Sequence, residues 1–171
     1  MRLYHFSENP NIRTFRPRQL PYRMNESAMV WAINEWHAYH YYFPRDCPRV
    51  CFWAKQDTSD SDRERFFGFS GTERIVAVES GWLDRFRDTP VYRYEFDAGQ
   101  FELYSEDAGY YISREEAAPI GVHRIDDCLG ALAEAGIEVR ITPSLQLLRA
   151  AIPSSTVQFS MIRMGNARTA E

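Results

Sequence analysis

The chain has 171 residues, of which 44% are hydrophobic and 26% charged, and its formal net charge is −4. This length and composition predict one globular domain, and the negative charge argues against a general nucleic-acid-binding surface. No apolar run reaches the roughly 18 to 20 residues that a membrane helix needs, and the N-terminus has no signal-peptide pattern. The three cysteines, Cys47, Cys51 and Cys128, are expected to be reduced thiols of a cytoplasmic protein. No metal site is predicted, because Cys47 and Cys51 lack a second pair of ligands.

The first predicted element is a strand over residues 2–6, where large residues alternate between two faces. Leu3 and His5 share one face, and Tyr4 and Phe6 share the other. A turn at residues 7–10 leads into a long irregular loop over residues 11–28, which the apolar residues within it indicate is ordered.

The aromatic-rich stretch over residues 29–53 predicts a strand, a short helix, a turn and a second strand. Asn34 has the chemistry of a helix N-cap, and Pro44 ends the helix predicted over residues 35–43. His37 and Tyr41 are four residues apart, so they are expected to share one face of that helix.

The remainder of the chain predicts short strands and short helices. A charged surface loop over residues 55–65 leads toward a possible helical turn. Further strands are expected at 74–79, 90–96, 109–113, 119–125, 137–141 and 156–161. Helices are expected at 81–88, at 126–136 with Asp126 as N-cap and Gly136 as its end, and after Pro143. Because many strands follow one another directly, the sequence predicts an α+β domain over residues 1–171 with a mainly antiparallel or mixed sheet.

Phosphate-loop, dinucleotide-binding, esterase and zinc-protease motifs are absent from the sequence. What remains is a constellation of three segments: LYHFS at residues 3–7, VWAINEWHAYHY at residues 30–41, and GYYISREEAAPI at residues 109–120. In their order and spacing these segments resemble the ADP-ribosyltransferase-like superfamily, the NAD-binding split-sheet fold of poly-ADP-ribose polymerases, rifampin ADP-ribosyltransferases and RNA 2′-phosphotransferases. The resemblance spans about residues 2–122, and residues 126–164 form an addition to it. Through LYHFSENP, VWAINEWH and FPRDCPR, the whole chain also resembles a bacterial family of unknown function.

The superfamily resemblance implies roles for named residues. His5 and Ser7 would contact the ribose of NAD, Tyr41 would stack on the nicotinamide, and Trp31 and Tyr110 would contribute to the NAD-binding cleft. Members of the superfamily usually carry a carboxylate at the start of the third strand, where this chain has Gly109. Asp107 and Glu115 are therefore the candidate catalytic carboxylates.

Arg18 and Arg45 are the arginines expected to meet a phosphate group, although both could equally be solvated or paired with neighbouring acids. Three functions stay open at this point. The first is transfer of ADP-ribose from NAD, or a related 2′-phosphate reaction, to an acceptor that the sequence does not identify. The second is a non-catalytic module that binds a nucleotide or peptide, and the third is an aromatic core without a ligand.

Overall fold

The computed structural model describes residues 1–169 and separates into two compact units, each made from two stretches of chain. The first unit comprises residues 1–41 and 90–126, and the second comprises residues 42–89 and the described residues from 127 to 169. The sequence predicts a core over residues 2–122 with an extension from 126 to 164. In the structure, contacts group residues 42–89 with the C-terminal segment. Within residues 1–169, no helix is both long and apolar enough to cross a bilayer.

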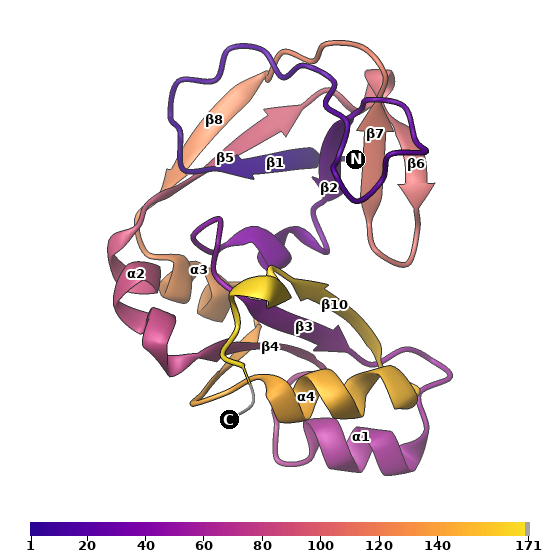
Figure 1. The fold of residues 1–171 in the computed structure, drawn as a ribbon, viewed down its shortest axis with the longest axis vertical. Helices are drawn as coiled ribbons and strands as arrows, with labels where there is room; N and C mark the ends of the chain where they lie inside the picture. The colour runs from indigo at the N-terminus through magenta and orange to yellow at the C-terminus, as the bar shows by residue number, and fades with distance from the viewer. Residues whose placement is uncertain (170–171) are drawn as a thin grey trace. The chain divides into compact units, whose positions relative to one another are not determined.

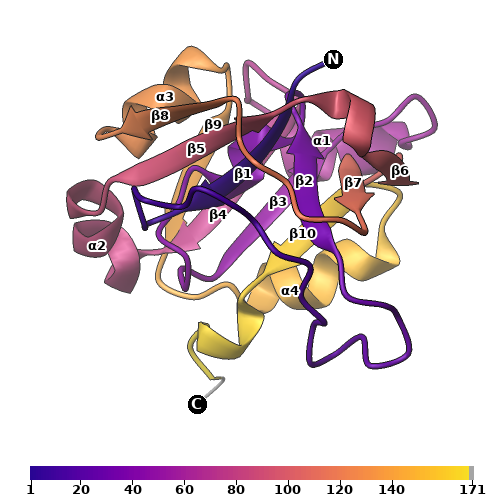
Figure 2. The ribbon, with the colours of Figure 1, turned by 90° about the horizontal axis from the view of Figure 1, so that it is seen from above.

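The first unit is built on a six-stranded sheet in which all neighbouring strands run antiparallel. The strand order is β6-β7-β2-β1-β5-β8, so β1 lies inside the sheet between β2 and β5 (Figures 1 and 2). Its strands are β1 (Leu3–Ser7), β2 (Val30–Asn34), β5 (Val91–Phe96), β6 (Glu102–Ser105), β7 (Tyr110–Ser113) and β8 (Gly121–Ile125). The short helices are η1 (Ala38–Tyr41) and η3 (Ala98–Gln100).

One face of this sheet carries the hydrophobic core of the first unit. Along β1 and β5, Leu3 is paired with Phe96 and His5 with Tyr94, so these four side chains point to the same side. The buried members of the cluster are Leu3, Phe15, Val30, Ala32, Tyr94, Phe96 and Ala117. Tyr4 and Phe6 alternate to the opposite face, which leaves them available to form a second aromatic cluster.

The long connection between β1 and β2 is tied to the sheet along its length (Figure 2). Phe15 exchanges backbone hydrogen bonds with Ala117, and Arg18 exchanges them with Met29. Phe15 also sends its ring into the core, where it meets Tyr94 and Phe96 edge-on. These contacts give the loop a defined path, as its embedded apolar residues lead us to expect.

The second unit contains a four-stranded sheet with strand order β10-β3-β4-β9. Its strands are β3 (Arg49–Trp53), β4 (Arg74–Glu79), β9 (Glu138–Thr142) and β10 (Gln158–Ile162). Only the pairing of β4 with β9 is parallel, and α3 lies between these two strands in the chain. The helices are α1 (Asp60–Phe67), η2 (Ser80–Trp82), α2 (Leu83–Asp88), α3 (Cys128–Glu134), α4 (Gln146–Ala151), η4 (Ile152–Ser154) and η5 (Met164–Asn166).

Helices α1 and α4 cover one face of this second sheet (Figure 1). Phe66 and Phe67 at the end of α1 pack with Phe52 of β3 in the core of the unit. The other buried members of this core are Val50, Ile75, Ala77, Leu145, Ile152 and Val157. The described residues thus form a mixed α+β structure with mainly antiparallel sheets and four short α-helices, which confirms that coarse prediction.

Several predicted boundaries differ from the structure for local reasons. The helix predicted over residues 35–43 is shorter in the structure, where it is the 3-10 helix η1. In a 3-10 helix residues three apart share a face, so His37 is aligned with His40 and not with Tyr41. The rings of His37 and His40 accordingly lie 5.5 Å apart. Helix α3 is capped by Asp127 and not by Asp126, because the Asp127 carboxylate accepts the Gly130 N–H. Strand β6 lies in a segment that the sequence predicts to be a loop. Its residues are mostly exposed, so the strand leaves no clear pattern of alternating apolar residues in the sequence.

Two buried cysteines neighbour the buried Arg49 in the second unit. Burial raises the pKa of the Cys47 thiol to about 11, against the opposing influence of the Arg49 charge. Burial likewise raises the pKa of Cys51 to about 12. Both thiols are therefore protonated at neutral pH, and the thiolate, which is the reactive form, is suppressed.

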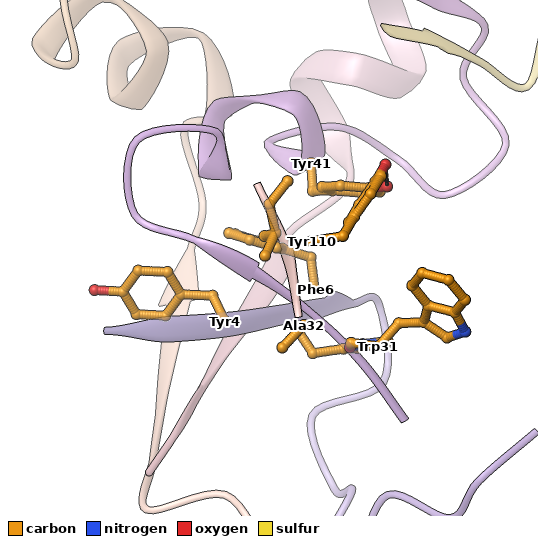
Figure 3. Close-up of a pocket in the computed structure, with 8 residues that line it drawn as sticks. Tyr4, Phe6, Trp31, Ala32, Tyr41 and Tyr110 are labelled. Atoms are coloured by element: carbon orange, nitrogen blue, oxygen red, sulfur yellow. Dashed lines mark hydrogen bonds between the residues drawn. The ribbon is translucent and has the colours of Figure 1, made fainter. Parts of the chain in front are cut away.

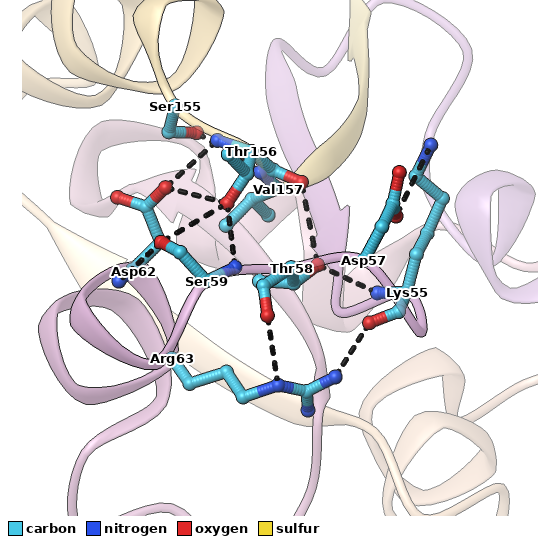
Figure 4. Close-up of polar contacts among 9 residues, drawn as sticks. All are labelled: Lys55, Asp57, Thr58, Ser59, Asp62, Arg63, Ser155, Thr156 and Val157. Carbon is cyan, nitrogen blue, oxygen red and sulfur yellow. Dashed lines mark hydrogen bonds and ion pairs between the residues drawn. The ribbon is translucent and has the colours of Figure 1, made fainter.

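A polar network joins the start of α1 to the segment before β10 (Figure 4). The Ser59 hydroxyl caps α1 by accepting the Asp62 N–H. The Asp62 carboxylate accepts both the Thr156 N–H at 2.8 Å and the Thr156 hydroxyl at 2.6 Å. The Thr156 hydroxyl oxygen in turn accepts the Ser59 N–H at 2.9 Å. Residues almost a hundred positions apart are thereby held together by charge-assisted hydrogen bonds.

We expect Asp62→Asn to lower the melting temperature at neutral pH. Hydrogen bonds from Thr156 hold the pKa of Asp62 below its ordinary value of 3.8. A depressed pKa contributes stability above the unfolded-state pKa, and this contribution is lost as pH falls through the folded-state pKa. The melting-temperature difference between wild type and Asp62→Asn should therefore shrink as pH falls below 3.8. Thermal unfolding followed by circular dichroism from about pH 7 to about pH 3 measures this melting-temperature difference.

Asp60→Asn is the matched control, because Asp60 lies in the same first turn of α1. Both acids favour the helix N-terminus electrostatically, but of the two it is Asp62 that accepts hydrogen bonds from Thr156. Equal losses in the two variants would mean that the helix dipole accounts for the effect and that the Thr156 network does not.

Candidate functional site

A small cavity in the first unit is lined by side chains from four elements (Figure 3). Its volume is about 90 Å³, several times the roughly 10–15 Å³ that one water requires. The lining residues are Tyr4, His5, Phe6, Trp31, Ala32, Ile33, Tyr41 and Tyr110. The cavity therefore has room for one small ring, and a larger ligand would extend out of it.

Three aromatic side chains define the centre of this cavity. Phe6 of β1 and Tyr41 of η1 lie nearly parallel, with ring centroids 6.1 Å apart and an interplanar angle of 15°. The hydroxyls of Tyr41 and Tyr110 lie 2.7 Å apart and share a hydrogen bond. Figure 3 shows the Tyr41 and Tyr110 side chains meeting at their hydroxyl ends. Residues far apart in the sequence thus form one continuous aromatic wall.

His5 borders the cavity, but its ring packs on the other face of the sheet from Tyr41. The His5 ring lies 4.7 Å from the Phe15 ring, which belongs to the core cluster on the Leu3 face. His5 Nδ1 is 2.9 Å from the backbone oxygen of Trp31. Because a carbonyl oxygen only accepts, Nδ1 carries the proton and donates. The side chain that reaches Tyr41 from β1 is therefore Phe6, the neighbour of His5.

Trp31 uses its indole mainly to anchor the β1–β2 loop. Its ring meets the Tyr104 ring edge-on at 4.7 Å, and the Arg23 guanidinium lies 5.2 Å from its centroid. Arg23 also bonds Glu26 and the Tyr104 hydroxyl. Within residues 1–169, the buried Trp31 Nε1 has no hydrogen-bond partner. This cluster holds the loop against β2 and β6, beside the cavity.

A contact between His37 and Gly109 positions the two tyrosines of the cavity. Asn34 Oδ1 accepts the His37 backbone N–H at 3.0 Å and lies 2.8 Å from His37 Nδ1. The Asn34 N–H donates to the Gly109 oxygen at 2.9 Å. Gly109 has a φ of +69°, and a Cβ atom there would lie 2.2 Å from His37 Nδ1. No side chain fits at this position, because both the backbone conformation and the neighbouring ring exclude it.

The candidate carboxylates lie outside the cavity lining. Asp107 is exposed in the turn over residues 106–109, which directly precedes Tyr110. Glu115 is exposed beyond the far end of β7, about 16 Å along an extended chain from Tyr110. In the third segment, Gly109 directly precedes Tyr110. The His37 ring leaves no room for an acidic side chain at Gly109.

The remaining candidate residues are also dispersed. Ser7 ends β1, and its hydroxyl accepts the Asn9 N–H at 3.1 Å. Arg18 is exposed in the β1–β2 loop, and Arg45 is exposed in the second unit. Of the nine candidates from the sequence, the cavity brings together His5, Trp31, Tyr41 and Tyr110.

The other four lining residues, Tyr4, Phe6, Ala32 and Ile33, were not among the candidates. The alternation along β1 could have identified Phe6 and Tyr4, because it puts them together on the face opposite His5. Burial raises the pKa of Tyr4, so its phenol is neutral at physiological pH. The cavity lining contains no carboxylate, ammonium or guanidinium group from the described residues. Among those residues, no three His, Cys, Asp or Glu side chains are grouped so that they could hold a metal ion.

The sequence model of a family of unknown function (DUF6886) matches residues 4–167. The chain belongs to this family. The match covers both units, including the cavity residues of this DUF6886 member and the polar network at Thr156. Comparisons with curated proteins and with solved structures yield no match.

We predict that Gly109→Ala destabilises the protein more than Gly136→Ala does. Both glycines have a φ of +69°, but an added Cβ at Gly136 meets no atom within 4 Å. Gly136→Ala should cost about 1–2 kcal/mol from the left-handed backbone alone. Gly109→Ala should cost more, because the His37 ring must also move. Chemical denaturation gives both free energies of unfolding, and the double variant His37→Ala/Gly109→Ala should recover part of the excess. Equal costs for the two glycines would show that the His37 contact imposes no constraint.

Proposed function

We propose that this protein is an ADP-ribosyltransferase-like nucleotide-binding module that holds the nicotinamide ring of NAD in the aromatic cavity of its first unit. The observation that carries the proposal is the convergence of Phe6, Tyr41 and Tyr110 around one ring-sized space. The rest of the nucleotide would lie outside this space, since a cavity of about 90 Å³ is smaller than a site that encloses a whole dinucleotide.

The electrostatic character of the lining favours a cationic ring. The faces of phenylalanine and tyrosine rings attract cations by roughly 0.5–2 kcal/mol. The cavity lining contains no lysine or arginine from the described residues. The Arg93 guanidinium lies over the Tyr4 ring at 4.8 Å, which shows that a cation can be held against an aromatic ring of this lining. The nicotinamide ring of oxidised NAD carries a positive charge, whereas adenine does not, so the nicotinamide end suits this cavity better.

Ligand entry between Phe6 and Tyr41 requires a small opening. A planar ring held between two others needs about 7 Å between the outer rings, twice a carbon contact of about 3.5 Å. Their centroids are 6.1 Å apart. A movement of about 1 Å by η1, which is only four residues long, would accommodate the ring.

Binding without turnover is the form of the proposal that the geometry favours. Cleavage of the nicotinamide–ribose bond develops positive charge on the ribose, which a nearby carboxylate would stabilise. Asp107 and Glu115 do not line the cavity, and the His5 ring packs on the opposite face of the sheet from Tyr41. The alternative is ADP-ribose transfer, or a related 2′-phosphate reaction, to an unidentified acceptor. In favour of it, the exposed Asp107 lies in the turn directly before Tyr110.

The binding prediction compares two ligands that differ in charge. We expect the cationic 1-methylnicotinamide to bind several-fold more tightly than neutral nicotinamide in isothermal titration calorimetry, on the order of the cation–π energy. Tyr41→Ala should weaken binding by about tenfold, the scale of one stacked aromatic contact, while Tyr41→Phe should retain most of it. Tyr22→Ala is the control, because Tyr22 is 78% exposed and does not line the cavity. Equal affinity for the two ligands, or equal effects of Tyr22→Ala and Tyr41→Ala, would contradict the proposal.

The turnover prediction separates the two functions. With millimolar NAD, we expect no release of nicotinamide above the rate without protein, as measured by liquid chromatography. If release is observed, Asp107→Asn should abolish it and Glu115→Gln should not, because only Asp107 is close in sequence to the cavity. Release that depends on Asp107 would establish the transferase alternative and reject binding without turnover.

A further inference from the structure

A second concave site lies in the second unit and is independent of the aromatic cavity. It is an open groove of about 730 Å³, within the usual range for small-molecule ligands. The groove is lined by Asp46, Trp82, Arg85, Arg163, Gly165 and Asn166. These residues come from the turn before β3, from η2 and α2, and from η5 and the residue before it.

Two arginines that line the groove give it a positive charge, and a third arginine lies near Trp82. Arg85 and Arg163 line it, and the Arg168 guanidinium lies 3.7 Å from where a Cβ on Gly81 would stand, next to Trp82. Within residues 1–169, none of these three guanidinium groups meets a carboxylate within salt-bridge distance. Asp46 is the single acid in the lining. With two arginines and one aspartate, the lining residues carry a net charge of about +1 on a chain whose net charge is −4.

Three contacts hold the groove walls, and the one made by Glu79 is buried. The Asn166 side chain donates to the Asp46 backbone oxygen at 2.8 Å. Glu79 is only 2% exposed, and its carboxylate accepts the N–H groups of Leu145 and Arg168, each at 3.1 Å. Arg85 lies over the Trp82 ring at 4.7 Å. Such fixation lowers the entropy that an arginine loses when it binds an anion.

Arg163 occupies a conformation that an ordinary residue avoids. Its φ is +56° and its ψ is 30°, in the left-handed region that is unfavourable for residues other than glycine. Glycine would remove this strain, yet arginine stands at the position where the chain turns into η5. A strained residue whose side chain lines a groove is a candidate for function.

From these observations we propose that the groove binds the diphosphate group of a small molecule, such as a nucleoside diphosphate or a sugar diphosphate. Guanidinium groups recognise phosphate oxygens with paired hydrogen bonds, so two of them in one groove match the two phosphates of a diphosphate better than a single phosphate. The groove volume leaves space for an organic group beside Trp82. Arg45, expected from the sequence to meet phosphate, directly precedes Asp46 in the chain but does not line the groove.

Calorimetric titration with inorganic pyrophosphate at low salt tests the proposal on the whole chain. We expect Arg163→Gly and Arg85→Ala each to weaken pyrophosphate binding by about tenfold or more, the scale of a charge-assisted hydrogen bond. Arg87→Ala is the matched control, because Arg87 is exposed on the same helix α2 and does not line the groove. Arg163→Gly should fold with an unchanged or higher melting temperature, since glycine relieves the left-handed strain.

Titrations with sulfate, ADP and a sugar diphosphate complete the experiment. Pyrophosphate should bind more tightly than sulfate. Whichever of ADP and the sugar diphosphate binds more tightly shows whether the natural ligand is a nucleoside diphosphate or a sugar diphosphate. Tyr41→Ala, which tests the aromatic cavity, should leave pyrophosphate binding unchanged, so the two proposals fail separately. Equal binding of sulfate and pyrophosphate, or an equal loss in Arg87→Ala and Arg163→Gly, would overturn the proposal.

Discussion

The close contact between the His37 ring and Gly109 sets the geometry of the aromatic cavity. It requires a glycine, since a Cβ at residue 109 would stand 2.2 Å from the imidazole. Asn34 reinforces the contact by accepting from His37 and donating to the Gly109 oxygen. Because Tyr110 follows Gly109 and Tyr41 follows His37 by one turn, the same contact brings their hydroxyls to 2.7 Å. The contact thus leaves no room for an acidic side chain at residue 109.

Alternation along β1 has an equally direct effect on function. Leu3 and His5 face the core cluster that contains Phe15, whereas Tyr4 and Phe6 face the cavity. The strand therefore offers the cavity a phenyl ring, and the imidazole of His5 is engaged with the Trp31 carbonyl. A neutral aromatic space is well suited to hold a flat cationic ring. It supplies no carboxylate to stabilise the positive charge that develops on the ribose during bond cleavage. For this reason we propose binding without turnover for the first unit.

The second unit distributes its charges in a different way. Its buried acid, Glu79, accepts the backbone N–H of Leu145, just before α4, and that of Arg168, just after η5. Both segments are thereby held in place. Two of its exposed arginines, Arg85 and Arg163, in contrast line a groove. Burial keeps the Cys47 and Cys51 thiols protonated, so they add no negative charge at neutral pH. The two units consequently present concave sites of opposite character: one is small and aromatic, and the other is open and cationic.

The sequence by itself determined three local features: the strand over residues 74–79, the N-cap chemistry of Asn34, and the glycine that ends α3. Each of these depends on residues that are neighbours in the chain. It also singled out His5, Trp31, Tyr41 and Tyr110, which border one cavity. Only the tertiary structure decided that Phe6 and not His5 meets Tyr41, and that Asp107 and Glu115 lie outside the lining. Only the tertiary structure also joined Trp82 and Arg85 to Arg163, about eighty residues away, in one groove. The physical reason is that such contacts depend on strand pairing and chain crossing, which local propensities do not encode.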